Sequence, residues 1–121
     1  MDTVEITWFD RAAVERALQE HIHWLSTRYP EIEEIVLFGS VASGTPVPGS
    51  DVDLLIVLSE SDRWFIDRIP AFLPDRFPVG VDVFPYTREE LERLKQSGSG
   101  LVRTALRDGT VLFRRLPESG T

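Results

Sequence analysis

Two aspartates that stand one residue apart are the residues of this chain with the clearest chemical potential. Asp51 and Asp53 open an apolar stretch that continues through Leu58, which is typical of a buried β-strand. Side chains at positions i and i+2 of a strand point to the same face, so both carboxylates should project together. Such a pair is stable at the mouth of a buried sheet when a cation lies between the carboxylates. Mg²⁺ prefers these oxygen ligands and completes its coordination shell with substrate phosphates.

A glycine and a serine end the apolar stretch that comes before this pair. Gly39 and Ser40 follow Ile32–Phe38, and the backbone amides of a turn or short helix at this point could meet phosphate oxygens. A loop rich in proline and glycine, residues 45–50, leads from there to Asp51. On its own, Gly-Ser is an ordinary tight turn with a capping serine. Ahead of the two aspartates, it indicates a phosphate site beside a metal site.

A third carboxylate lies in the next β-branched run, which spans Val79–Phe84. Asp82 alone could be an exposed residue of an edge strand. If this strand lies beside the strand of Asp51 and Asp53, the three carboxylates can share a pair of ions. That arrangement is the two-metal clamp used for in-line displacement at phosphorus.

This pattern resembles the nucleotidyltransferase superfamily typified by DNA polymerase beta, and within it the minimal nucleotidyltransferases. Their motif is Gly-Ser, a gap, Asp-x-Asp and a later Asp, and the likeness runs from about Glu33 to Phe113. The resemblance implies that Asp51 and Asp53 bind two Mg²⁺ ions. It also implies that Asp82 completes one metal site near the attacking hydroxyl.

The resemblance further implies a nucleotide site and one departure from the family pattern. Gly39 and Ser40, with Ser50, would bind the triphosphate of ATP or another NTP. Many minimal members carry an arginine where this chain has Ser43. Either Arg103 or Arg107 of a later helix replaces that cation, or phosphate binding depends more on the metal and the backbone.

The implied activity is Mg²⁺-dependent transfer of a nucleoside monophosphate, with AMP from ATP as the leading case, to an acceptor hydroxyl. Stand-alone minimal nucleotidyltransferases are often encoded beside a small helical HEPN protein, and some are antitoxins that modify it with AMP. The resemblance therefore implies a HEPN-type partner or a homo-oligomer. The alternatives are a small-molecule nucleotidyltransferase of the aminoglycoside-modifying kind and a non-catalytic domain that binds nucleotide or a partner.

Composition limits the other functional classes. The chain has 121 residues, which suits one domain, and a net charge of −7, which disfavours nucleic acid as a partner. It has no cysteine, so disulfides and thiolate metal sites are excluded. Its longest apolar run, Leu54–Leu58, is too short to span a membrane, and the N-terminus does not resemble a signal peptide. We therefore expect a cytoplasmic protein.

Hydrophobic periodicity predicts an α/β (α+β) fold in which helices flank a mixed β-sheet. We expect one domain over residues 1–116 and a frayed tail over residues 117–121. If an apolar patch remains exposed among Trp64, Phe65, Phe72 and Phe77, it is the best candidate for a partner surface. The expected strands are Ile32–Phe38, Asp51–Leu58, Val79–Phe84 and Thr110–Phe113, and the expected helices are Asp10–Tyr29, one that starts at Ser59 or Ser61 and is interrupted near Pro70, Thr87–Lys95 and Leu101–Arg107.

Overall fold

The computed structural model describes residues 10–39 and 52–116, which form one four-stranded sheet with helices on both faces. This architecture confirms the predicted α/β fold class. Across these residues, no helix combines the length and hydrophobicity that a membrane span requires. The elements are α1 (Arg11–Arg28), β1 (Ile32–Phe38), β2 (Val52–Leu58), α2 (Phe65–Phe72), β3 (Val81–Thr87), α3 (Arg88–Ser97), α4 (Gly100–Asp108) and β4 (Thr110–Arg114).

The sheet has the strand order β3-β2-β1-β4 and contains both kinds of pairing. β1 is antiparallel to β2 and to β4, whereas β2 and β3 are parallel. β2 is therefore an inner strand, and every residue in it is buried except Asp53, which is half-buried. This result confirms the prediction that the strand is covered on both faces.

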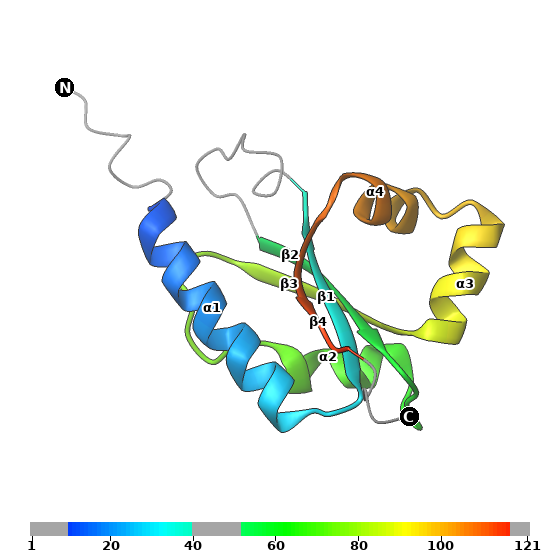
Figure 1. Cartoon of the computed structure of the whole chain (residues 1–121), viewed down its shortest axis with the longest axis horizontal. Helices are drawn as coiled ribbons and strands as arrows, with labels where there is room; N and C mark the ends of the chain where they lie inside the picture. The colour runs from blue at the N-terminus through cyan, green and yellow to red at the C-terminus, as the bar shows by residue number, and fades with distance from the viewer. Residues whose placement is uncertain (1–9, 40–51, 117–121) are drawn as a thin grey trace.

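Two hydrophobic layers cover the sheet, because alternate residues of each strand point to opposite faces. In Figure 1, α1 runs along one side of the sheet, and α3 and α4 lie on the other side. Leu54 and Ile56 of β2 pack in the first layer with Leu18 and Leu25 of α1. The buried residues of the second layer are Val36, Phe38, Leu55, Val57, Leu91, Val102 and Ala105.

Capping side chains fix the ends of two helices as the sequence predicts. The carboxylate of Asp10 accepts a hydrogen bond of 3.1 Å from the Ala13 N–H, and this contact starts α1. Thr87 and Glu90 form the predicted capping box at the start of α3. β3 runs directly into α3, so this cap also fixes the direction in which the chain leaves the sheet.

Two predicted boundaries around prolines are wrong. β3 continues through Pro85 to Thr87 instead of ending at Phe84, because an edge strand tolerates a residue that has no N–H. α2 starts at Phe65 rather than near Ser61, and Pro70 lies inside it. Pro70 and the residue four positions before it, Ile66, are both exposed, so water can reach the carbonyl that Pro70 leaves without a donor.

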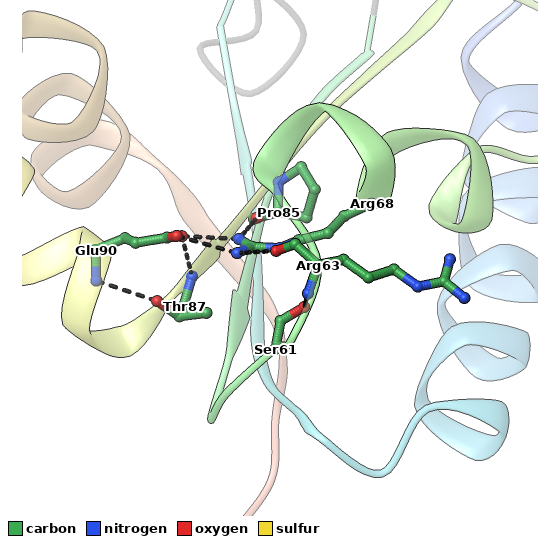
Figure 2. A network of polar contacts seen from close by, with 6 residues as sticks. All are labelled: Ser61, Arg63, Arg68, Pro85, Thr87 and Glu90. Carbon is green, nitrogen blue, oxygen red and sulfur yellow. Dashed lines mark hydrogen bonds and ion pairs between the residues drawn. The ribbon is translucent and has the colours of Figure 1, made fainter.

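A buried arginine joins α2 to β3 and α3, as Figure 2 shows. Only 4% of Arg68 is exposed. Its Nη1 donates to Glu90 Oε1 at 2.7 Å and to the Pro85 carbonyl at 2.9 Å, and its Nη2 donates to Glu90 Oε2 at 3.0 Å. Its Nε and Nη2 also donate to the Arg63 carbonyl, at 2.9 and 2.7 Å. The buried charge thus has a bidentate counter-charge and two carbonyl acceptors.

The same contacts favour the ionised form of Glu90. Hydrogen bonds from Arg68 and from the Thr87 N–H outweigh burial and lower the pKa of Glu90 from 4.5 to about 2. A carboxyl group whose pKa is lower in the folded state stabilises the fold above its unfolded pKa. That stabilisation is lost as the pH falls through the folded pKa.

Glu90→Gln should therefore lower the free energy of unfolding at neutral pH by about 2 kcal/mol, because Arg68 stays buried without a full counter-charge. Glu89→Gln is the matched control, since Glu89 pairs with Arg93 at an exposed site, and it should cost under about 0.5 kcal/mol. Urea unfolding measures both values. The Glu90→Gln deficit should be constant above pH 4.5 and shrink towards pH 2. A deficit that does not depend on pH would contradict the ion-pair explanation.

Candidate active site

Two of the predicted catalytic carboxylates are direct neighbours across the parallel pair of strands. Asp53 of β2 lies opposite Asp82 of β3, and Phe38 of β1 lies opposite Asp53 on the other side. Register partners project to the same face of a sheet. Because Phe38 belongs to the second hydrophobic layer, the row Phe38, Asp53 and Asp82 lies on the face that α3 and α4 cover.

Aromatic side chains mark the point where this hydrophobic layer gives way to the carboxylates. The rings of Phe38 and Phe84 lie 5.5 Å apart between centroids, and Phe84 is two residues beyond Asp82 on the same face of β3. Asp82 is exposed, whereas Asp53 is half-buried. Asp82 is therefore open to a substrate group, and Asp53 lies closer to the apolar layer.

Gly39 brings the backbone at the end of β1 against one of these carboxylates. Its φ is +86°, a left-handed conformation that favours glycine. A Cβ atom at this position would collide with Asp53 Oδ2. Position 39 thus requires glycine for two reasons: the left-handed backbone conformation and the close approach of the Asp53 carboxylate.

The remaining predicted site residues, Ser40, Ser50 and Asp51, lie outside the described residues, as does Ser43. Within residues 10–39 and 52–116, no group of three or more His, Cys, Asp or Glu side chains could hold a metal ion. Asp53 and Asp82 contribute oxygen donors only, and the chain has no cysteine. This donor set fits Mg²⁺ and does not fit a thiolate-bound metal.

Comparison with known proteins gives the family. The family described as "Nucleotidyltransferase domain" matches residues 18–111, a range that includes Gly39, Asp53 and Asp82. The chain belongs to this family. A relative from Methanocaldococcus jannaschii, named "Putative protein adenylyltransferase", is 31% identical over 100 residues, which are 82% of this chain and 97% of that protein. This nucleotidyltransferase is thus of the minimal kind, as its sequence indicates.

A solved structure supports the same fold. The crystal structure of "a putative nucleotidyltransferase from Sulfolobus solfataricus" superimposes with a TM-score of 0.59 and 21% identity. The match covers 88% of this nucleotidyltransferase and 91% of the other chain. The shared sheet and helices therefore account for most of both molecules.

The two candidate replacements for the missing arginine differ in their surroundings. Arg107 donates to Asp108 at 3.1 Å through both Nε and Nη2, and this contact lowers the pKa of Asp108. Arg103 and Arg107 both line a cavity of about 430 Å³ between α3 and α4, and Arg103 forms no ion pair among the described residues. A phosphate contact by either arginine stays a prediction.

No local pattern in the sequence indicates the contact between Gly39 and Asp53, because this contact depends on how β1 and β2 pair. The sequence interpretation also missed Arg68, which holds the far end of β3. A signal for Arg68 did exist. A charged residue lies at helical spacing from Phe65 and Phe72 on the apolar face of α2, and such a residue requires a buried partner.

On the expectation that Gly39 and Asp53 bind MgATP, Gly39→Ala should weaken that binding at least tenfold, because the methyl group displaces the Asp53 carboxylate. Gly98→Ala is the control for the left-handed conformation. Gly98 has φ +87°, and its Cβ would meet Arg103 Nη2 at 3.9 Å, an ordinary van der Waals contact that does not displace the guanidinium. Both variants should lose about 1 kcal/mol of stability from the backbone conformation alone. Equal MgATP affinity of the two variants in calorimetry would show that the contact with Asp53 is irrelevant to the nucleotide.

Proposed function

We propose that this chain transfers AMP from ATP to a hydroxyl group of a partner protein, with Mg²⁺ as the metal. The observation that carries the proposal is the register of Asp53 opposite Asp82, beside the turn at Gly39. Two carboxylates on one face, next to exposed backbone, suit a triphosphate with its metal. The name of the archaeal relative, a protein adenylyltransferase, supports protein as the acceptor class.

The chemistry is an in-line displacement at phosphorus. The acceptor oxygen forms a bond to the α-phosphorus of ATP, the bond from that phosphorus to the bridging oxygen breaks, and pyrophosphate leaves. Asp82 takes the proton of the acceptor hydroxyl, and its exposure on the edge strand suits this role. Asp53 and Gly39 orient the triphosphate, because catalysis of this kind depends mainly on positioning.

The metal has a defined place in this proposal. Asp53 and Asp82, with Asp51 as the sequence predicts, would hold two Mg²⁺ ions. Bound Mg²⁺ neutralises negative charge on the phosphates and on the leaving pyrophosphate.

We further propose that the acceptor is a HEPN-type helical protein and that this chain is its antitoxin. The described helices and strands all belong to the sheet and the layers that cover it. None of them forms a separate acceptor-binding unit among the described residues. A partner protein would bring its own hydroxyl to Asp82 together with the surface that positions it.

A transfer assay tests this role. The purified product of the adjacent gene, mixed with this protein and MgATP, should gain the mass of AMP in intact-mass spectrometry. Asp53→Asn and Asp82→Asn should each lower the rate at least 100-fold, because each removes a carboxylate from the reacting centre. Asp75→Asn, at an exposed site outside the row of carboxylates, should keep it. AMP transfer to kanamycin instead of the protein would favour the small-molecule alternative.

Thermal unfolding separates a ligand site from a structural one. MgATP at 100 times its dissociation constant should add about 2.7 kcal/mol and raise the melting temperature by roughly ten degrees. EDTA should remove most of this rise. Asp82→Asn should melt like the wild type without ligand, because Asp82 is exposed, and should lose most of the rise. A comparable drop in the ligand-free melting temperature would show that Asp82 is structural.

A further inference from the structure

Two large apolar side chains at the start of α2 face solvent. Trp64 is 82% exposed and Ile66 is 69% exposed. Within the described residues, only Leu116 among the large hydrophobic side chains has comparable exposure. We name Trp64 and Ile66 the α2 patch. An exposed indole forgoes the free energy that its burial would contribute, so the patch suits a surface that a partner covers.

The polar network around Arg68 holds Trp64 in this position. Arg68 donates two hydrogen bonds to the carbonyl of Arg63, the residue before Trp64 (Figure 2). The carbonyl of Trp64 accepts the Asp67 N–H at 2.9 Å, and the ring of Phe65 stacks on Tyr86 with centroids 4.6 Å apart. The backbone is therefore fixed on both sides of the indole. Such preorganisation lowers the entropic cost of binding.

Negative charge outweighs positive charge around the α2 patch. Glu60, Asp62 and Asp67 are exposed, and none of them forms an ion pair within the described part of the chain, while the exposed guanidinium of Arg63 lies beside them in the sequence. Glu60 and Asp62 also line a cavity of about 630 Å³ to which Glu31, Arg63 and Arg68 contribute, and the charge of Arg68 is balanced by Glu90. Six other carboxylates of the described surface have basic partners: Glu15, Glu33, Glu34, Glu89, Glu92 and Asp108. Asp10, Glu20, Asp75 and Asp82 are also exposed without an ion pair among the described residues, so it is the closeness of three carboxylates in sequence, Glu60, Asp62 and Asp67, that distinguishes the α2 patch.

We propose that the α2 patch binds a protein whose surface offers an apolar pocket for Trp64 with lysine or arginine side chains at its rim. The unpaired carboxylates select the basic rim, and the fixed indole fills the pocket. A second copy of this acidic chain fits less well, because like charges would meet. The inference rests on the proposed function, since it supplies the surface through which the acceptor protein is held.

This surface is separate from the carboxylates. Trp64 follows the Leu58 end of β2, whereas Asp53 lies at the opposite end of that strand. The partner therefore contacts the α2 patch with one part and presents its hydroxyl with another. Loss of the patch should weaken binding of the partner and leave binding of ATP unchanged.

Titration calorimetry with the purified product of the adjacent gene tests this separation. Trp64→Ser and Ile66→Ser should each keep the melting temperature, because both side chains are exposed, and Trp64→Ser should weaken binding about 30-fold. Trp24→Ser is the matched control, because Trp24 is a partly exposed tryptophan of α1, and it should bind like the wild type. The double variant Asp62→Asn, Asp67→Asn should lose most of the salt dependence of binding.

The outcomes distinguish this inference from the proposed function. Asp53→Asn should bind the partner with wild-type affinity and transfer no AMP. Binding that depends on Trp64 without any AMP transfer by the wild type would sink the proposed function and keep the docking surface. Equal affinity of Trp64→Ser and the wild type, or no binding of that partner at 100 times the concentration of enzyme used in the transfer assay, would overturn the surface. A wild-type dimer that Trp64→Ser dissociates would overturn it in favour of self-association.

Discussion

The register of β2 against its two neighbours is the constraint on which the rest of the structure depends. β2 is covered on both faces, so the packing of its apolar residues prevents it from sliding against β1 and β3. A slip of β2 by one residue would move Asp53 into the layer of α1. That layer has no place for a carboxylate. The hydrophobic packing of Leu54 to Leu58 thus fixes where the charge of Asp53 appears, and β3 in parallel register brings Asp82 beside it.

The sequence predicts the elements well where local signals agree. The apolar stretch that ends at Gly39 predicted β1 with its observed bounds, and the caps at Asp10 and Thr87 predicted the starts of α1 and α3. The prolines misled the prediction, because their effect depends on what lies beside them. A proline would end an inner strand of a sheet. β3 is an edge strand, so it continues through Pro85.

The candidate site was predictable in its residue types and less so in its geometry. The spacing of Gly39, Asp53 and Asp82 indicates metal and phosphate chemistry, yet strand order decides which of them meet. The approach of Gly39 to Asp53 and the pair of Arg68 with Glu90 both join segments that are distant in the sequence. No local pattern encodes such contacts, because they arise when the sheet and its helices pack together.

The outer edge of β3 has a consequence for how the molecule behaves in a crowded solution. An edge strand is a template on which another chain can add a strand and start an aggregate. Pro85 offers no N–H on this edge, and its carbonyl is already occupied by Arg68 from α2. An incoming strand would therefore find neither an N–H nor an unoccupied carbonyl at Pro85. Arg68, which pairs with Glu90 of α3, thus also hinders the addition of a foreign strand at this edge.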